Sequence, residues 1–121
     1  SGLEPSVVLD GSLLFTEFKG ALTEQYVAQE LLAQGHDPAY WSSDTGRAEV
    51  DFAVQSKSIV LPIEVKAGEN LQSKSLRVAC EKFALDRAVR TSLSKYRDEG
   101  WLINIPLWAI GCLDNLAAKR Q

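Results

Sequence analysis

Histidine and cysteine are scarce in this chain of 121 residues, which has one histidine, His36, and two cysteines, Cys80 and Cys112. Two cysteines so far apart in the sequence form neither a zinc-binding pattern nor a disulfide framework, and we expect both to be small buried residues in a reducing compartment. His36 lies in the turn-forming sequence Gly-His-Asp-Pro, without a second ligand or a nucleophile beside it, and we expect a solvated turn residue. The sequence therefore gives little support to a zinc site or to histidine-based catalysis.

Long apolar runs are also missing, so we expect a cytoplasmic protein that has no membrane partner. No Gly-x-x-x-x-Gly-Lys-Ser/Thr loop occurs, and ATP is therefore not expected to bind this chain through a P-loop. The composition, 45% hydrophobic and 24% charged, is ordinary for a globular protein. We expect one domain over residues 15–121, preceded by an N-terminal extension over residues 1–14.

Basic residues are few in the first half of the chain. Residues 1–64 hold ten acids and three bases, a net charge of −7, and residues 65–121 hold six acids and ten bases, a net charge of +4, which together give the −3 of the whole chain. This asymmetry has two interpretations. The charges lie on solvated faces without a common role, or an acidic metal site faces a basic patch that could meet phosphates.

Residues 47–66 are predicted to form two β-strands joined by a polar turn. Apolar and polar residues alternate in both strands, 47–54 and 59–66. A turn made by Ser56 and Lys57 has an even number of residues, which places the apolar residues of both strands on the same face of the sheet. The opposite face then carries four charged side chains, Glu49, Asp51, Glu64 and Lys66.

This charged face can be an ordinary solvated surface, with Lys66 paired to a carboxylate, or a metal site. In the expected register Glu49 faces Glu64 at roughly 5 Å between Cβ atoms, which is unfavourable without a cation. Asp51 is diagonal to Glu64, about 7–8 Å away, so both carboxylates can reach one hard divalent ion. Pro62 removes one hydrogen-bond donor from its strand, and we expect a bulge there, next to Glu64.

A helix is predicted over residues 16–34, with Thr16 as its N-cap. Glu24 precedes Val27 and Leu31 by three and seven positions, so it shares the apolar face of this helix. A carboxylate on a face that packs into the core needs a polar partner or a metal. A salt bridge or hydrogen bond at the rim of the apolar face and a role in the charged site remain alternatives for Glu24.

A second helix is predicted to start after Ser73, its N-cap, with an apolar face formed by Leu76, Ala79, Cys80 and Phe83. Cations in the first turn of a helix oppose the helix dipole, unless an anion lies nearby. A phosphate bound by the backbone amides and by Lys74, Ser75 and Arg77 would remove this conflict. A solvated turn with flexible side chains is the alternative.

Further strands are predicted over residues 39–43, 87–93 and 101–110, the last as a strand pair or an edge strand, and a short helix over 113–118. The strand at 87–93 follows a helix, so it should lie parallel to the preceding strand through a right-handed crossover. The expected fold is α/β. It has a helix, a three-stranded antiparallel meander, a second helix and further strands, which form a mixed central sheet with helices on its faces.

Asp51, followed after twelve residues by Glu64, Val65 and Lys66, resembles the acidic core of the PD-(D/E)XK nuclease superfamily, with Val50 at the position of the superfamily's proline. A longer series of motifs resembles the domain of unknown function found C-terminal to AAA+ ATPase modules in bacteria and archaea. The motifs occupy residues 18–27, 48–52, 62–68, 73–76 and 105–107, and the resemblance extends over residues 15–110.

The resemblance implies a restriction-endonuclease-like core and a Mg²⁺- or Mn²⁺-dependent nuclease. Asp51 and Glu64 would bind the metal, Glu24 would be a further ligand, and Lys66 would position or activate the attacking water. The nucleic acid would be a partner, contacted by Arg47, Lys74, Ser75 and Arg77. The resemblance also implies an AAA+ ATPase module in the same full-length protein as a second partner.

Two other functions remain open. A non-catalytic accessory domain of an ATPase would keep the fold and contact nucleic acid or protein, and the sequence pI of about 5.1, with no basic stripe, favours it. A dimerisation module would show an exposed apolar patch around Trp101, Leu107 and Trp108. The complete set of Glu24, Asp51, Glu64 and Lys66 favours catalysis.

Overall fold

The computed structural model describes residues 5–42, 49–56, 58–67 and 73–118. Asp44-Thr45-Gly46, a sequence that predicts a hairpin turn between the first two strands, lies outside them. The elements are, in order, α1 (Pro5–Ala33), β1 (Ala39–Ser42), β2 (Glu49–Ser56), β3 (Ile59–Lys66), α2 (Lys74–Phe83), β4 (Ala88–Ser92), β5 (Arg97–Asp98), β6 (Leu102–Pro106), the 3-10 helix η1 (Leu107–Cys112) and α3 (Leu113–Ala118).

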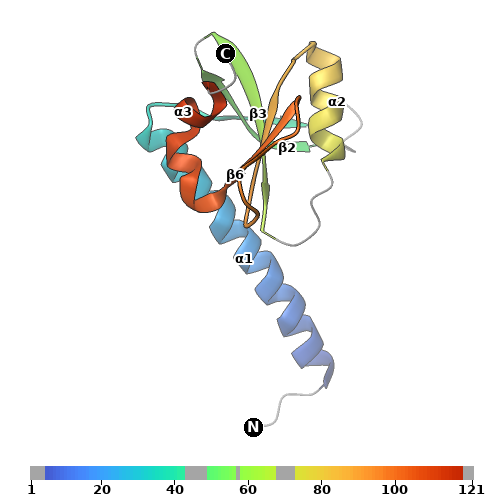
Figure 1. The fold of residues 1–121 in the computed structure, drawn as a ribbon. Coiled ribbons are helices and arrows are strands. Elements are labelled where there is room, and N and C mark those ends of the chain that lie inside the picture. Colours follow the sequence, from blue (N-terminus) through green and yellow to red (C-terminus); the bar gives the residue numbers. More distant parts are fainter. Residues whose placement is uncertain (1–4, 43–48, 57, 68–72, 119–121) are drawn as a thin grey trace.

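The strands form one mixed sheet of six strands in the order β1-β2-β3-β4-β6-β5. The first three strands are antiparallel, β3 and β4 are parallel, and β4 and β6 are parallel. Helix α2 connects β3 to β4 and covers one face, whereas α1, η1 and α3 cover the other (Figure 1). The α/β fold, the antiparallel meander and the parallel crossover are therefore confirmed.

Each face of the sheet has its own hydrophobic core. The core under α1, η1 and α3 contains Val27, Leu31, Val54, Leu61, Ile63, Val89, Ile103, Ile105, Ile110 and Leu113. The smaller core under α2 contains Val50, Leu76, Ala79, Cys80, Ala88 and Leu102. Ile63 and Val89 face α1, so the residues that follow them on β3 and β4, Glu64 and Arg90, face the α2 side. Polar side chains on these strands thus gather on one face.

The turn between β2 and β3 lies one residue later in the chain than expected, so β2 extends to Ser56 and β3 pairs from Ile59. Ser56 pairs with Ile59 and Phe52 pairs with Ile63, so the connection is residues 57–58 instead of Ser56 and Lys57. Ser58 has a φ of 70°, a left-handed conformation of the kind that tight two-residue turns require. The register moves by two residues, which preserves the faces and brings Asp51 level with Glu64.

A bulge interrupts β2 beside Asp51, and not β3 at Pro62 as expected. Pro62 pairs regularly with Ala53, whereas the β1–β2 register shifts between the pairs Ala39–Ala53 and Trp41–Val50. One extra residue in a strand reverses the faces of the residues beyond it. The prediction that Val50 shares a face with Phe52 is therefore wrong, because Val50 packs under α2 and Phe52 packs under α1.

Helix α1 is longer than predicted. It begins at Pro5, a residue favoured in the first turn because its missing N–H would have no helical acceptor, and it includes Thr16 as an interior residue. Residues 5–14 are therefore helical and continuous with the helix that packs on the sheet. Figure 1 shows the first half of α1 extending beyond the sheet, while the second half contacts it through Val27 and Leu31.

The C-terminal segment also differs from its prediction. Residues 102–106 form an interior strand, β6, between β4 and β5, and Pro106 ends it where η1 begins. The short strand β5 was not expected. Helix α3 is confirmed. Trp108 is 83% exposed, whereas Trp101 is half-buried against the α2 core, so the two do not form one apolar patch.

Candidate functional site

Asp51, Glu64 and Lys66 lie together where β2 and β3 adjoin. Lys66 Nζ lies 3.3 Å from Glu64 Oε1, and the lysine side chain is 30% exposed. The backbone N–H of Val65 donates a 2.7 Å hydrogen bond to Asp51 Oδ2, which fixes this carboxylate beside the strand that carries the other two residues. The alternation of β3 puts Glu64 and Lys66 on one face, and the bulge in β2 turns Asp51 toward Val65.

Glu64 is buried at 7% exposure, which is unusual for a carboxylate. Burial raises the pKa of its carboxyl above the usual range, and the Asp51 carboxylate adds to this rise. The Lys66 ammonium and, more weakly, the Ser73 hydroxyl lower the pKa and so oppose the rise. Oε1 pairs with Lys66, but Oε2 is buried without a hydrogen-bond partner among the described residues. This oxygen therefore lacks the partner that a buried polar atom needs.

A buried arginine, Arg90, extends the polar site from β3 into β4, where it pairs in register with Glu64. Its Nε donates to Asn104 Oδ1 at 3.0 Å and its Nη1 donates to Ser73 Oγ at 3.2 Å. Its Nη2 lies 3.4 Å from Glu99 Oε2. Arg90 thus joins the start of α2, β4 and β6 around one guanidinium group.

Asn104 on β6 holds the far side of this network. Its Oδ1 also accepts a 2.7 Å hydrogen bond from Ser92 Oγ, and its Nδ2 donates to the backbone carbonyls of Ser94 and Lys95. The side chain is 1% exposed. Because all of its polar atoms are engaged, Asn104 fixes both Arg90 and the turn that follows β4.

Arg90, Asn104 and Glu99 were missed by sequence reasoning. A signal for Arg90 existed, since it interrupts the apolar part of the strand Ala88–Ser92, where every residue is buried. A charged residue at a fully buried strand position needs a partner. Asn104 shows the same pattern in β6, between Ile103 and Ile105.

Glu24 is exposed and is not part of the buried site, contrary to the prediction that it faces the core. Val27 and Leu31, which share its helical stripe, are fully buried. Glu24 therefore has the helical spacing of this stripe but not its burial. The proposed metal-ligand role of Glu24 stays a prediction.

Within the described residues, no three acidic, histidine or cysteine side chains are grouped closely enough to hold a metal ion. The side chain of Glu49 lies outside the described part of the chain, as does Arg47. Asp51 and Glu64 are therefore the two carboxylates that the structure brings together. Mg²⁺ usually uses only one or two carboxylates, with water or phosphate oxygens as its other ligands, so this pair fits such an ion.

The start of α2 differs from a capped helix. Ser73 occupies the N-cap position but makes no capping hydrogen bond, and its hydroxyl instead accepts from Arg90. Lys74 is exposed, Ser75 is half-buried, and Arg77 places its guanidinium carbon 5.2 Å from the centroid of the Trp101 ring. The first turn of α2 thus adjoins the Glu64 site, and its predicted contacts with nucleic acid remain untested.

Two sequence predictions outside the site are wrong. The His36 side chain is only 8% exposed, and its Nε2 lies 3.1 Å from Asp114 Oδ1, which ties the end of α1 to α3. Cys112 is exposed, although Cys80 is buried as expected. None of the helices in the described part of the chain has the length and hydrophobicity that a membrane span needs.

Comparison with protein families gives one match, to a domain of unknown function, DUF4143, over residues 19–109. This match covers β1 to β6 and the part of α1 that packs on the sheet, and so includes Asp51, Glu64, Lys66 and Arg90. Comparison with curated proteins and with solved structures gives no match. The chain therefore belongs to the DUF4143 family, domains of unknown function.

Proposed function

We propose that this domain is a metal-dependent nuclease with a PD-(D/E)XK, restriction-endonuclease-like core, which hydrolyses phosphodiester bonds of nucleic acid. The observation that carries the proposal is the buried oxygen of Glu64, Oε2, which has no hydrogen-bond partner among the described residues and lies in a carboxylate flanked by Asp51 and Lys66. A buried carboxylate with a raised pKa beside a second carboxylate is typical of a functional site, and a bound cation would offset the cost of its charge.

Each residue of the site has a role that follows from its position. Asp51 and Glu64 would hold Mg²⁺ or Mn²⁺, with water or phosphate oxygens as the other ligands. When bound, such an ion polarises the phosphate and lowers the pKa of its water. Lys66, whose ammonium lies 3.3 Å from Glu64, is close enough to the carboxylate pair to orient the attacking water or to hold a phosphate oxygen. Arg90 would keep Ser73 and the start of α2 in place.

Cleavage assays on three variants test this proposal. With millimolar Mg²⁺ or Mn²⁺ and single-stranded, duplex and branched DNA, the wild type should cleave at least one substrate. Asp51→Ala and Lys66→Ala should each lower the rate by about 10²–10⁴, as expected for loss of one catalytic group. Lys95→Ala, a change at an exposed lysine, is the matched control and should retain the wild-type rate.

The two catalytic variants should differ in metal binding. Lysine is not an oxygen ligand, so Lys66→Ala should keep the metal-dependent rise in melting temperature, whereas Asp51→Ala should lose it. Cleavage that persists in Asp51→Ala would overturn the assignment of the site. No cleavage by the wild type with either metal would count against an active nuclease in this isolated domain.

The second candidate is a non-catalytic accessory domain of an AAA+ ATPase. It is supported by the ion pair between Lys66 and Glu64, which already partly neutralises the site without a metal, and by the pairing of only two carboxylates among the described residues. On this alternative no variant cleaves, and Asp51→Ala raises the melting temperature of the metal-free protein by removing a repelling carboxylate.

A further inference from the structure

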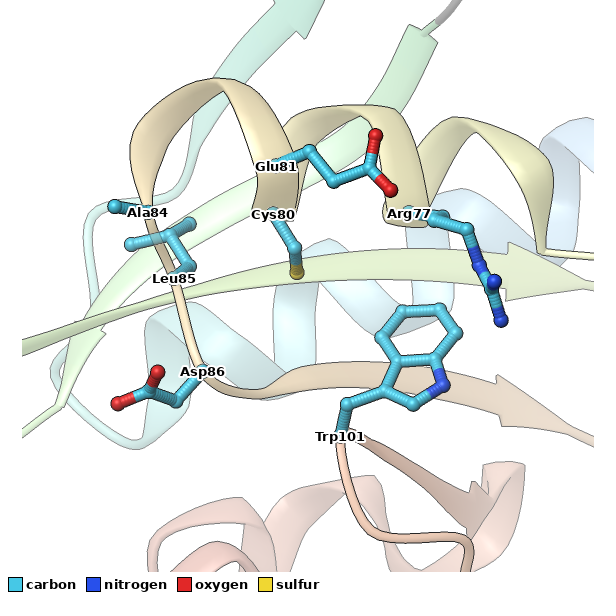
Figure 2. Close-up of a pocket in the computed structure, with 7 residues that line it drawn as sticks. All are labelled: Arg77, Cys80, Glu81, Ala84, Leu85, Asp86 and Trp101. Atoms are coloured by element: carbon cyan, nitrogen blue, oxygen red, sulfur yellow. The ribbon is translucent and has the colours of Figure 1, made fainter.

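A pocket lies between the underside of α2 and the segment that precedes β6 (Figure 2). Its volume is about 440 Å³, within the range of small-molecule sites. Seven residues line it: Arg77, Cys80, Glu81, Ala84, Leu85, Asp86 and Trp101. Of these residues, the nuclease interpretation uses only Arg77, as a predicted contact with nucleic acid.

The walls of the pocket are held by backbone hydrogen bonds. Trp101 O accepts from the N–H of Ala88 at 2.7 Å, and Leu85 N–H donates to Cys80 O at 2.9 Å. Ala84 ends α2 in the left-handed conformation, with φ of 52°, which directs the chain around the pocket. The backbone that carries the indole is therefore fixed at the start of β6.

The pocket has an aromatic wall, with Arg77 at one end and Asp86 at the other (Figure 2). The Arg77 guanidinium lies 5.2 Å from the centroid of the Trp101 indole. Figure 2 shows Asp86 at the end of the pocket away from Arg77, with Cys80 between them. Burial raises the pKa of the Cys80 thiol, and the charges of Asp86 and Glu81 raise it further, so the thiol stays neutral and both carboxylates act on the middle of the pocket.

The Arg77 end of the pocket adjoins the candidate nuclease site. Arg77 N–H donates to Ser73 O at 3.2 Å, and Ser73 in turn contacts Arg90 and lowers the pKa of Glu64. Ser73 and Arg77 are four residues apart, a rise of about 6 Å along the helix axis. A phosphate beside Glu64 and Ser73 would therefore have Arg77, and then the indole, within reach of the same nucleotide chain.

We propose that this pocket binds an unpaired nucleobase of the substrate, stacked on Trp101, in a nucleotide next to the scissile phosphate. The inference rests on the proposed nuclease function and names its substrate as single-stranded at that position. A base in a duplex is paired and stacked, so moving it out of the duplex into the pocket costs free energy. An unpaired base enters without this cost. Glu81 and Asp86 accept hydrogen bonds, so they favour bases with an exocyclic amino group over thymine.

Direct binding measurements test the proposal without relying on cleavage. Fluorescein-labelled eight-nucleotide oligomers of dA, dC and dT, and a dA oligomer with abasic sites, are titrated in EDTA with anisotropy as the readout. The wild type should bind dA and dC more tightly than dT, and the abasic oligomer most weakly. Trp101→Ala should weaken dA binding by roughly 5- to 100-fold, the range for loss of one stacked base, and Trp101→Phe should restore most of it.

Trp108→Ala is the matched control, because Trp108 is exposed on η1 and lies outside the pocket, and it should bind dA as the wild type does. A Trp41→Phe, Trp108→Phe protein keeps Trp101 as its one indole, and its fluorescence should be quenched by dA and not by the abasic oligomer. This measurement needs no change at Trp101 and stands if Trp101→Ala fails to fold.

Equal binding of abasic and intact oligomers, absence of quenching, or absence of single-strand binding would each overturn the stacking proposal. These outcomes differ from failure of the nuclease proposal. One outcome is metal-dependent cleavage of duplex DNA that is lost in Asp51→Ala and unchanged in Trp101→Ala. This outcome would support the nuclease proposal and contradict the base-binding pocket. Base-dependent binding without cleavage would keep the pocket and favour the accessory domain.

Discussion

The Glu64 carboxyl makes stability depend on pH in a direction opposite to that of most carboxylates. Its pKa is raised in the folded protein, chiefly by burial, so the folded state binds more protons than the unfolded state between the usual pKa, 4.5, and the raised one. Stability therefore falls as pH rises through this window. Glu64→Gln should remove this fall, and urea unfolding of the metal-free protein at pH values from 4 to 8 measures it.

Asp37→Asn is the control for this comparison, because Asp37 is an exposed carboxylate in the loop after α1. It should leave the difference between pH 4 and pH 8 unchanged. If Glu64→Gln and the wild type show the same dependence of stability on pH, folding does not disfavour the Glu64 carboxylate. That result would contradict the main argument for a metal bound at Glu64.

Arg90 and Arg97 both pair with Glu99, but they differ in burial. The Arg90 side chain is 7% exposed and lies 3.4 Å from Glu99, whereas the Arg97 side chain is 75% exposed and lies 3.8 Å away. Arg90→Ala should cost about 3–5 kcal/mol, because Asn104 and Ser73 lose a buried partner. Arg97→Ala should cost at most about 1 kcal/mol. Chemical denaturation of both variants measures the difference, and equal losses would contradict the network.

At the scale of elements, the attachment of α1 to the sheet is the simplest contact to test. Leu31 is fully buried in the core under α1, and its neighbour Leu32 is 57% exposed. Leu31→Ala should lower the free energy of unfolding by about 2–5 kcal/mol through lost contacts and a cavity. Leu32→Ala, with the same change in composition, should stay within about 0.5 kcal/mol. Similar losses in both variants would mean that α1 packs through a different face.

The order of elements from β2 to β4 could be predicted from the sequence, because the alternation of β3 and the helical spacing of α2 are local patterns. The faces of β2 could not. A bulge adds one residue without changing composition, so Val50 and Phe52 look equivalent in the sequence and lie in different cores. The interior place of β6 depends on pairing with β4, which no local pattern encodes.

Only the part of the candidate site that depends on local patterns could be predicted from the sequence. Parity along β3 gives Glu64 and Lys66 a common face, whatever the turn. Glu24 was misplaced because helical periodicity predicts which residues share a stripe, but not how far along the helix that stripe is covered. Arg90 and Asn104 meet through the pairing of β4 and β6, and a contact between strands of that kind becomes visible only when the sheet is assembled.

At the scale of the whole molecule, a bound metal should stabilise the fold. A ligand that binds only the native state at ten times its dissociation constant contributes about 1.4 kcal/mol. For a domain of this size the melting temperature should rise by roughly 3–8 °C on adding Mg²⁺ or Mn²⁺, as measured by calorimetry. Asp51→Ala should abolish the rise. An equal rise in Asp51→Ala would show that the ion binds elsewhere on the surface.

The pairing of Arg90 with Asn104 has a consequence for synthesis. Asn104 follows Glu64 by 40 positions (104 − 64) in the chain. At about 5–20 residues per second, a ribosome needs roughly 2–8 s to add this segment after β3 has been made. Late in this interval, once Arg90 has been added, the nascent protein contains Asp51, Glu64, Lys66 and Arg90, but Asn104, which accepts a hydrogen bond from Arg90, is still missing. A message broken before the codon for Asn104 would thus yield a product that carries all three of these charged residues but lacks the asparagine that binds Arg90.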